Sequence, residues 1–502
     1  MSNYTPDYKK GAVNPYNFVS LGNGVTRNEP IKGKLTGVIH CSMINATPLA
    51  IPDFPNQKTE KVRNEKGKIE DHNKVPFFRV NGKPVITGSE IRGVIHSAYE
   101  TLSNSCLSVN NDNILSARSA DIRNPGLSPA QISRHRVDDL LGSYRHCDDT
   151  NYVCEACNLF GMIGKNDCDP SAIASRLRFT DAAVEKESKL FYATLKELAS
   201  PHISSVEFYS TAPNMKHQWN YDTRGIKLNG RKYYFHHKGD YSTRVKNGRN
   251  ITAELIDKGA KFGFDIFFEM FTEDELKKLV WTLTIGENKA DGNQMHKIGH
   301  GKPIGLGSVK IIVDSVITRS FDPIKTEFTD KELDVDKLIE NIPFDENAAY
   351  FNEFKSITDF DYLEGKKVAY PYGDDGNDKK TSKGTLTWFK ANHNDGKTVN
   401  PDEKCNIRYH LPKITDKENL VLPALIKDGK SGKERSSGGV KRTESSYNVP
   451  TSFSGKVTDP NSAKFMCRKC NTWNVVQKSV PFPKPNLPII CKKCGNKFYE
   501  KY

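Results

Sequence analysis

"KFGFDIFFEMFTEDELKKLVWTLTIG", residues 261–286, places the clearest strand signal of this chain directly before a helix signal. In residues 261–271 apolar side chains recur at every second position, as they do in a strand with one buried face. Thr272 and Glu275 then form the Thr-x-x-Glu pattern of a capping box, which opens a helix. The apolar side of that helix consists of Leu276, Leu279, Val280 and Leu283. The stretch therefore predicts a strand followed at once by an amphipathic helix.

Similar elements lie on both sides of this stretch. Residues 33–44 have the apolar pattern of a strand, and residues 87–103 predict a helix that opens with a second capping box, Thr87 with Glu90. Residues 309–317, "VKIIVDSVI", predict a β-branched strand. The order strand, helix, strands, helix, strand predicts an α+β domain of the ferredoxin-like or RNA-recognition type.

The remaining sequence predicts insertions and further regions. Residues 104–250 are too many for simple connections, so we expect large insertions there. Residues 345–430 favour β structure, with "TLTWF" and "NLVLPALI" as the clearest strands, and residues 427–442 have the composition of a charged linker. We therefore expect a first domain over 1–320, a β-leaning basic accessory region with a linker over 321–455, and a small terminal domain over 456–502.

The charge of the chain favours an anionic partner. There are 74 Lys and Arg against 61 Asp and Glu, which gives a formal net charge of +13. Nucleic acid is the leading expectation and an anionic membrane surface the second, although many basic proteins bind neither. No stretch reaches the roughly 18 apolar residues of a membrane span, and the first residues do not resemble a signal peptide. We expect a cytoplasmic protein with no membrane partner.

Basic and aromatic residues alternate between residues 219 and 249, a pattern that suits single-stranded nucleic acid. From Arg224 to Arg249 there are eight Lys or Arg and one Asp. "LNGRKYYFHH" in this stretch predicts a hairpin with an Asn-Gly turn, and Arg231 and Lys232 on it are candidate RNA contacts. A solvated hairpin without a partner is the alternative.

The C-terminal region has the spacing of a zinc ribbon. Two C-x-x-C pairs are separated by twenty residues, which is the spacing of a tetrahedral site closed around a small hairpin. The expected zinc ligands are Cys467, Cys470, Cys491 and Cys494. Residues 464–502 carry nine basic and one acidic residue, so the ribbon could contact RNA, or it could be purely structural.

A third C-x-x-C pair lies in "CEACNLFG" and suggests a second zinc site. The four candidate ligands, all within a short stretch, are Cys147, Cys154, Cys157 and Cys168. The alternative is that these cysteines are small buried side chains without a metal.

"HKIGHGKPIGLGSV", residues 296–309, is the most glycine-rich stretch with basic residues. A phosphate-binding loop of a nucleotide enzyme follows a strand and precedes a helix. This stretch follows the predicted helix after Thr272 and precedes the predicted strand at 309–317, and it lacks the Walker spacing. We therefore do not expect a nucleotide-hydrolysing enzyme or a dinucleotide-binding dehydrogenase.

In order along residues 14–313, these motifs resemble those of the CRISPR-associated RAMP superfamily, whose members include backbone subunits of type III effector complexes. "NPYNFVSL" resembles the opening of a large type III-associated RAMP subfamily, and "GKLTGVIHCSMINATPLAI" the family's first strand and loop. "KPVITGSEIRG" is similar to the signature at the start of the first helix, with Thr87 and Glu90 as departures. "CEACNLFG", "SRLRFTDA" and "GHGKPIGLGSVKI" resemble the C-x-x-C segment, the central strand and the glycine-rich loop.

The resemblance implies that the glycine-rich loop and the first helix contact the backbone of guide RNA (crRNA). Glycines would let RNA approach the main chain, and lysines would pair with phosphates. A tight turn needed only for packing is the alternative. Together with Arg231 and Lys232 of the basic and aromatic stretch, the candidate RNA-binding residues are Lys74, Arg79, Ser89, Arg92, Lys297, Gly299, His300, Gly301, Lys302, Gly305 and Gly307.

Some relatives cut target RNA with an aspartate shortly before a stretch that resembles "KVPFFRV". The matching position here holds Lys74, and Asp71 stands three residues earlier in an expected polar loop. Asp71 could supply the carboxylate for a Mg²⁺-assisted attack of the ribose 2′-OH on phosphate, or it could be a solvated acid of that loop.

We therefore expect a RAMP subunit of a type III-like CRISPR effector complex in antiviral defence. Its expected partners are crRNA, target RNA, other effector subunits and copies of itself, and its expected cofactors are structural Zn²⁺ and, for RNA cleavage, Mg²⁺. Two alternatives stay open. One is a cap subunit or a crRNA-processing ribonuclease with His296 and His300 as acid and base. The other is a non-catalytic zinc-ribbon RNA-binding scaffold.

Overall fold

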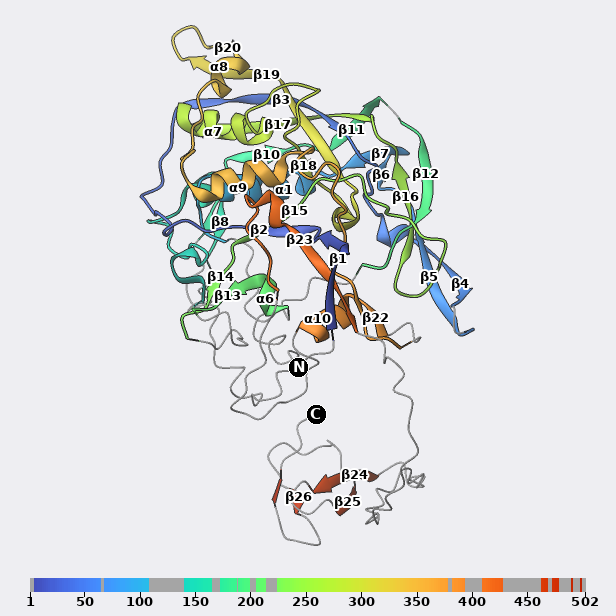
Figure 1. Cartoon of the computed structure of the whole chain (residues 1–502). Helices are drawn as coiled ribbons and strands as arrows, with labels where there is room; N and C mark the ends of the chain where they lie inside the picture. The colour runs from blue at the N-terminus through green and yellow to red at the C-terminus, as the bar shows by residue number, and fades with distance from the viewer. Residues whose placement is uncertain are drawn as a thin grey trace, which may run out of the picture. The chain divides into compact units, whose positions relative to one another are not determined.

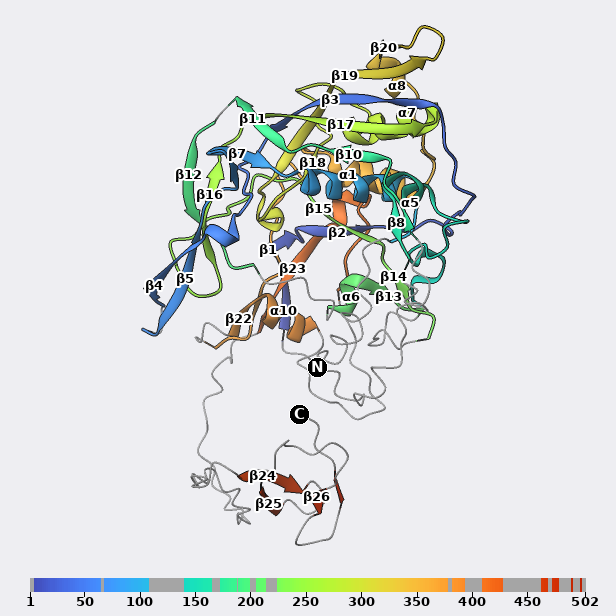
Figure 2. The ribbon, with the colours of Figure 1, turned by 180° about the vertical axis from the view of Figure 1, so that it is seen from behind.

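A computed structural model (Figures 1 and 2) describes residues 4–64, 67–107, 140–164, 172–186, 188–198, 205–213, 224–377, 382–392, 409–427, 462–467, 472–477, 489–490 and 497–498. It divides into two compact units, Met1–Lys430 and Ser431–Tyr502. The mixed α+β class expected from the sequence is confirmed by several sheets and a few short helices.

The largest sheet in the described part of the chain has nine strands and forms the centre of the first unit. Its main path runs through β18 (His296–Lys297), β19 (Ser308–Asp322), β3 (Leu35–Asn45), β17 (Lys261–Phe271), β11 (Ala182–Lys186), β7 (Lys83–Ile86) and β6 (Arg79–Val80). Beside it, β10 (Leu177–Phe179) pairs with β17, and β20 (Glu327–Leu333) pairs with β19. Strands β19, β3, β17 and β11 are adjacent and antiparallel.

Two helices cover one face of this sheet. Helix α1 (Gly88–Leu102) follows β7, and helix α7 (Glu273–Thr284) follows β17 without a loop. Phe262, Phe264 and Ile266 of β17 are buried in one cluster with both helices, because the alternation in residues 261–271 turns every second side chain toward them. Figures 1 and 2 show α7 along the same side of β3 and β17 from both directions. The strands predicted at 33–44, 261–271 and 309–317 and both predicted helices are confirmed, while the finer ferredoxin-like assignment stays a prediction.

A four-stranded sheet lies beside the central one. It has the order β12 (Leu190–Thr194), β16 (Ile251–Ile256), β5 (Ile69–Val75), β4 (Lys58–Arg63). The expectation of a polar loop between residues 57 and 74 is wrong, because β4 and β5 pair as a hairpin from Lys58 opposite Lys74 to Arg63 opposite Ile69. Strand β4 has no buried residue and β5 buries the polar His72, so neither strand shows the apolar alternation that marks a half-buried strand.

The third sheet joins the two ends of the first unit. Its order is β1 (Tyr4–Val13), β23 (Val421–Lys427), β21 (Gly373–Asp374), β22 (Lys383–Gly384). Further short pairs join β15 (Arg231–Tyr234) to β2 (Tyr16–Val19), β13 (Ser210–Thr211) to β14 (Lys227–Leu228), and β8 (Met162–Ile163) to β9 (Ala172–Ile173). The other α-helices of the described residues are α5 (Glu155–Phe160), α6 (Val206–Tyr209), α8 (Val335–Ile339), α9 (Ala349–Thr358) and α10 (Thr385–Asn392).

Three local predictions are wrong. Strands β14 and β15 flank Asn229 and Gly230 but pair with β13 and β2, so "LNGRKYYFHH" is not a hairpin. "TLTWF" begins helix α10, in which the Trp388 indole donates to the Pro423 carbonyl oxygen at 2.9 Å. In both places a tertiary partner outweighs the local pattern. The third concerns α1: of the two predicted capping boxes, α7 has both bonds, whereas α1 has only the bond from the Glu90 amide to the Thr87 hydroxyl.

The second unit is described by its strands alone. Strand β24 (Ser462–Cys467) pairs with β25 (Thr472–Gln477), and β26 (Ile489–Ile490) pairs with β27 (Lys497–Phe498). Of the four expected ribbon ligands, Cys467 ends β24, and Cys470, Cys491 and Cys494 lie outside the described residues. In the described ranges, no helix combines the length and apolar character needed to cross a bilayer.

Candidate nucleic-acid interface and metal centre

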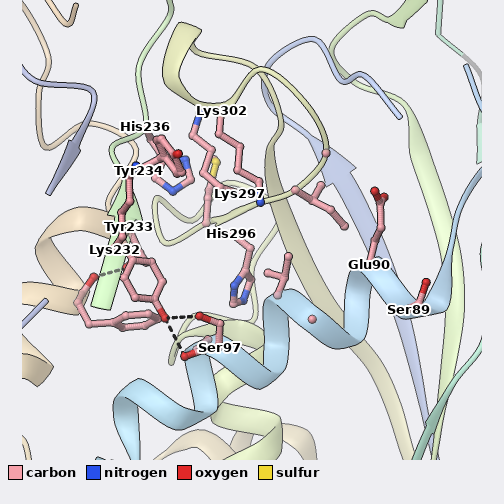
Figure 3. Close-up of a pocket in the computed structure, with 18 residues that line it drawn as sticks. Ser89, Glu90, Ser97, Lys232, Tyr233, Tyr234, His236, His296, Lys297 and Lys302 are labelled. Carbon is pink, nitrogen blue, oxygen red and sulfur yellow. Dashed lines mark hydrogen bonds between the residues drawn. The ribbon is translucent and has the colours of Figure 1, made fainter. Parts of the chain in front are cut away.

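A cavity of about 330 Å³ lies where α1, β15, α9 and the glycine-rich loop meet (Figure 3). The loop follows β18 and contains a 3-10 turn, Lys302–Ile304. Of the residues expected to bind RNA, the cavity is lined by Ser89, Lys232, Lys297, Gly299 and Lys302. These residues are separated by up to about two hundred positions in the sequence, and the fold brings them together.

Strand β15 is held against α1 by one tyrosine. The Tyr233 hydroxyl donates to the Ser97 carbonyl oxygen at 2.8 Å and shares a hydrogen bond with the Thr101 hydroxyl at 2.7 Å. The next side chain toward the N-terminus, Lys232, lies 3.8 Å from the centre of the Tyr16 ring and donates to the Tyr209 hydroxyl at 3.2 Å. Aromatic faces therefore stabilise the Lys232 ammonium without neutralising it.

The four glycines of the loop all have positive φ, between 73° and 93°. A Cβ on Gly299 would lie 2.4 Å from the Ala50 carbonyl oxygen, and a Cβ on Gly307 would lie 1.9 Å from the Ile298 carbonyl oxygen. Glycine is therefore required at these two positions by the backbone conformation and by contacts within the protein. Contact of Gly299, Gly301, Gly305 and Gly307 with RNA stays a prediction.

Burial changes the pKa of the cationic groups at this cavity. It lowers the pKa of Lys297 to about 7, with a smaller effect from Lys302, and lowers the pKa of Lys232 to about 8. The pKa of Lys302 is lowered by burial and raised by nearby Glu90. Glu90 is the only carboxylate among the described residues that line the cavity. The Lys232 ammonium lies against Tyr16 and Tyr209, which do not line the cavity, so Lys297 and Lys302 are the two lysines set against the one carboxylate. Two lysines and one carboxylate leave an excess of positive charge when both lysines are protonated, which an anionic group would relieve.

The two histidines of the alternative ribonuclease prediction are not arranged alike. His296 is buried and hydrogen-bonded through Nε2 to the Leu283 carbonyl oxygen at 3.0 Å, and burial lowers its pKa to about 4. His300 is half-buried and does not line the cavity; its amide donates to the Ala50 carbonyl oxygen at 2.9 Å. These contacts anchor the loop and do not favour an acid and base pair.

Other expected RNA contacts make bonds within the protein. Arg79 pairs with Glu254 at 2.7 Å, and Arg92 donates to the Phe160 carbonyl oxygen at 2.6 Å, which ties α1 to α5. Arg231 is buried and donates to the Ser105 carbonyl oxygen. Lys74 lies 4.1 Å from the centre of the Tyr192 ring on the four-stranded sheet. RNA binding by these four residues stays a prediction.

Asp71, the expected catalytic residue, lies on β5 and pairs with Lys61 of β4 at 2.5 Å. Both side chains are more than half exposed, and neither lines the cavity. Asp71 is therefore a surface residue of a hairpin, on a different sheet from the glycine-rich loop.

Four buried cysteines form the candidate metal centre. The Sγ atoms of Cys106, Cys147, Cys154 and Cys157 all lie within 4.8 Å of one another. Three of these were expected from the sequence. Cys106 takes the fourth place, and Cys168, which was expected there, lies outside the described residues. The spacing of the sequence does not point to Cys106, because it is 41 residues before Cys147 and belongs to no C-x-x-C pair. The fold brings it, from the segment after α1, to the other three cysteines.

The geometry of this group fits one tetrahedral metal ion. The Cys106 Sγ lies 3.5 Å from that of Cys157 and 3.6 Å from that of Cys154. The edge of a tetrahedron with Zn–S bonds of 2.3 Å is about 3.8 Å, whereas a disulfide is about 2.05 Å. The Cys154 amide and the Arg27 Nε each donate to the Cys147 sulfur at 3.3 Å, as expected around a thiolate ligand. The group could therefore hold a metal ion.

Comparison with known proteins agrees with the motifs. The sequence profile of the RAMP superfamily ("RAMPs") matches residues 22–310, more than half of the chain. The chain belongs to the RAMP superfamily. Among solved structures, this RAMP protein is similar to Csc2 of Thermofilum pendens, with 12% identity over 66% of this chain and 88% of that one, at a TM-score of 0.28. No curated protein matches the sequence.

Proposed function

We propose that this RAMP protein binds guide RNA as a subunit of a type III-like CRISPR effector complex. The observation that carries the RNA binding is the cavity with Lys232, Lys297 and Lys302 around it and one carboxylate in its lining. Partly desolvated ammonium groups attract phosphate more strongly than exposed ones, because water screens them less. The proposal is also supported by the family resemblance, which implies that the first helix and the glycine-rich loop contact the RNA backbone.

A charge reversal at Lys302 tests RNA binding. We expect K302E to weaken binding of a labelled single-stranded RNA at least about tenfold and to reduce the slope of log K against log salt by about 0.7, the value for one phosphate contact on a single strand. The control is K331E, which changes the charge equally on the exposed strand β20. Equal binding by wild type, K302E and K331E would contradict the proposal.

The CRISPR role has its own test. When the protein is expressed with a CRISPR array, we expect the RNA that copurifies with it to consist mainly of repeat and spacer sequences. Copurified RNA that reflects the general RNA of the cell would contradict the guide-RNA assignment. It would leave RNA binding by the cavity intact, because phosphate contacts carry no sequence information.

We propose zinc as the metal of the buried cysteine group and of the C-terminal ribbon. Four thiolates in tetrahedral arrangement are typical ligands of structural zinc, which would hold Cys106, in the segment that follows α1, against α5. Zinc at this place would stabilise the fold of the region next to the cavity and supply no reaction step.

Cleavage of target RNA by Asp71 stays a prediction with a direct test. Loaded complex, complementary labelled RNA and Mg²⁺ should give regularly spaced cuts that D71N abolishes, while K61Q, which removes its partner, should preserve them. Intact target with the wild-type complex would remove the catalytic claim and leave the binding claim in place.

A further inference from the structure

Glu90 does not make the contact that its position in the sequence predicts. At the third position of a helix that begins with Thr, a Glu side chain ordinarily returns a hydrogen bond to the capping residue. In α7 this happens, because the Glu275 carboxylate accepts from the Thr272 amide at 2.9 Å. In α1 the Thr87 hydroxyl accepts from the Glu90 amide at 3.4 Å, and the reciprocal bond is missing among the described contacts.

The Glu90 carboxylate instead faces the lysine cavity. Figure 3 shows its side chain on the side of α1 where Lys297 and Lys302 lie. Its Oε2 atom is buried and has no hydrogen-bond partner in the described part of the protein. Burial raises the pKa of Glu90, and nearby Lys302 opposes that rise. The carboxylate thus lies partly buried in the same cavity as Lys302, without the hydrogen bond of a capping box and with reduced hydration.

An RNA phosphate and the Glu90 carboxylate would have the same requirement here, which is a partly desolvated ammonium group. Both carry negative charge on oxygens, and like charges at close range repel strongly in a poorly hydrated site. The charged groups around the cavity besides Glu90 and Lys302 are Lys297 of the loop and Lys232 of β15, with His236 and His296 buried beside them. None of these supplies a second negative charge.

We propose that Glu90 occupies the place of an RNA phosphate beside Lys302, so that RNA must displace this carboxylate in order to bind. Glu90 then sets the affinity of the cavity for anions. Its carboxylate weakens the binding of a single phosphate, whereas an RNA strand with several phosphate contacts binds tightly enough to displace it. The inference rests on the proposed RNA binding of the same cavity.

Neutralising Glu90 should therefore strengthen binding, whereas loss of an ordinary contact residue weakens it. We expect E90Q and E90A to bind single-stranded RNA about tenfold more tightly than wild type at low salt, the effect of removing one repulsive charge at a partly buried site. We also expect inorganic phosphate to compete with RNA at lower concentration in E90Q than in wild type. Both variants should unfold at nearly the wild-type temperature.

A matched control separates this local effect from the change in net charge. E269Q makes the same change at the exposed end of β17 and should leave RNA affinity within about twofold of wild type. Affinity that is unchanged or weaker in both Glu90 variants would overturn the inference, and so would an equal gain in E269Q.

Failure of the inference differs from failure of the proposed function. If K302E weakens RNA binding and E90Q does not strengthen it, the cavity binds RNA and Glu90 is not its competitor. If K302E has no effect, the cavity is not the RNA site and both statements are wrong.

Discussion

Lys297 should make the proposed RNA binding by the cavity sensitive to pH, and the size of the effect follows from its burial. Burial lowers the pKa of Lys297 to about 7, and its ammonium donates to the Leu306 carbonyl oxygen at 3.0 Å. An RNA phosphate beside Lys297 requires the charged form, so binding takes up a proton wherever the free protein has lost it. From pH 6 to pH 8 the charged fraction falls about tenfold, and the affinity for RNA should fall by a similar factor.

For the protein without RNA, the same lowered pKa makes the contribution of Lys297 to the free energy of unfolding change with pH in the opposite direction. An unfolded Lys297 has the ordinary pKa of about 10.4, so between pH 7 and 10 the unfolded chain binds more protons than the folded one. The contribution of this residue to the free energy of unfolding therefore rises with pH over that range. Weaker RNA binding at pH 8 is then not explained by loss of the fold.

Fluorescence anisotropy with labelled single-stranded RNA at constant ionic strength measures this prediction. K297R should bind at pH 6 as wild type does and keep that affinity to pH 8, because a guanidinium stays charged. Repeating the series in E90Q removes any contribution of the Glu90 carboxyl. The reasoning is refuted if wild-type affinity is constant from pH 6 to pH 8, or if K297R loses affinity as steeply as wild type.

Three further predictions concern the metal centre, the buried ion pair between Arg176 and Glu275 of α7, and the glycine-rich loop. C106S should reduce bound zinc by one ion per chain relative to wild type, whereas C41S, at a buried cysteine outside the group, should leave zinc content unchanged in elemental analysis. E275Q leaves the buried Arg176 guanidinium without its negatively charged partner. In urea titration it should lower the free energy of unfolding by about 3–5 kcal/mol, whereas E273Q, at an exposed position of the same helix turn, should lower it by about 1 kcal/mol or less. G299A should lower the free energy of unfolding by about 2 kcal/mol or more. The loss should exceed that of G259A, because Gly259 has a similar φ but open space where the Cβ would lie. A zinc content unchanged by C106S, or equal losses within either matched pair, would contradict these assignments.

Much of the fold could be predicted from local sequence patterns, because the main strand and helix of the central sheet are recognised without knowledge of their distant partners. Strand 261–271 and helix α7 follow from alternation, a capping box and one apolar stripe. The exposed hairpin β4–β5 and helix α10 do not. Strand β4 has no buried residue and β5 buries the polar His72, so apolar alternation is missing from both. The Trp388 indole is hydrogen-bonded to Pro423, which is 35 residues away.

For the site, the sequence by itself determined which residue types are present: the lysines and glycines of the loop, the start of α1, and three of the four clustered cysteines. Only the tertiary structure decided which of them meet, because cavities and metal sites depend on distances that the chain order does not fix. In the folded protein, Arg79 and Arg92 form bonds within the protein, and Cys106 lies beside the other three cysteines. Lys232 lines the same cavity as the lysines of the loop. The tertiary structure also placed the Glu90 side chain in the lining of the cavity, where its buried Oε2 atom has no hydrogen-bond partner in the described part of the protein.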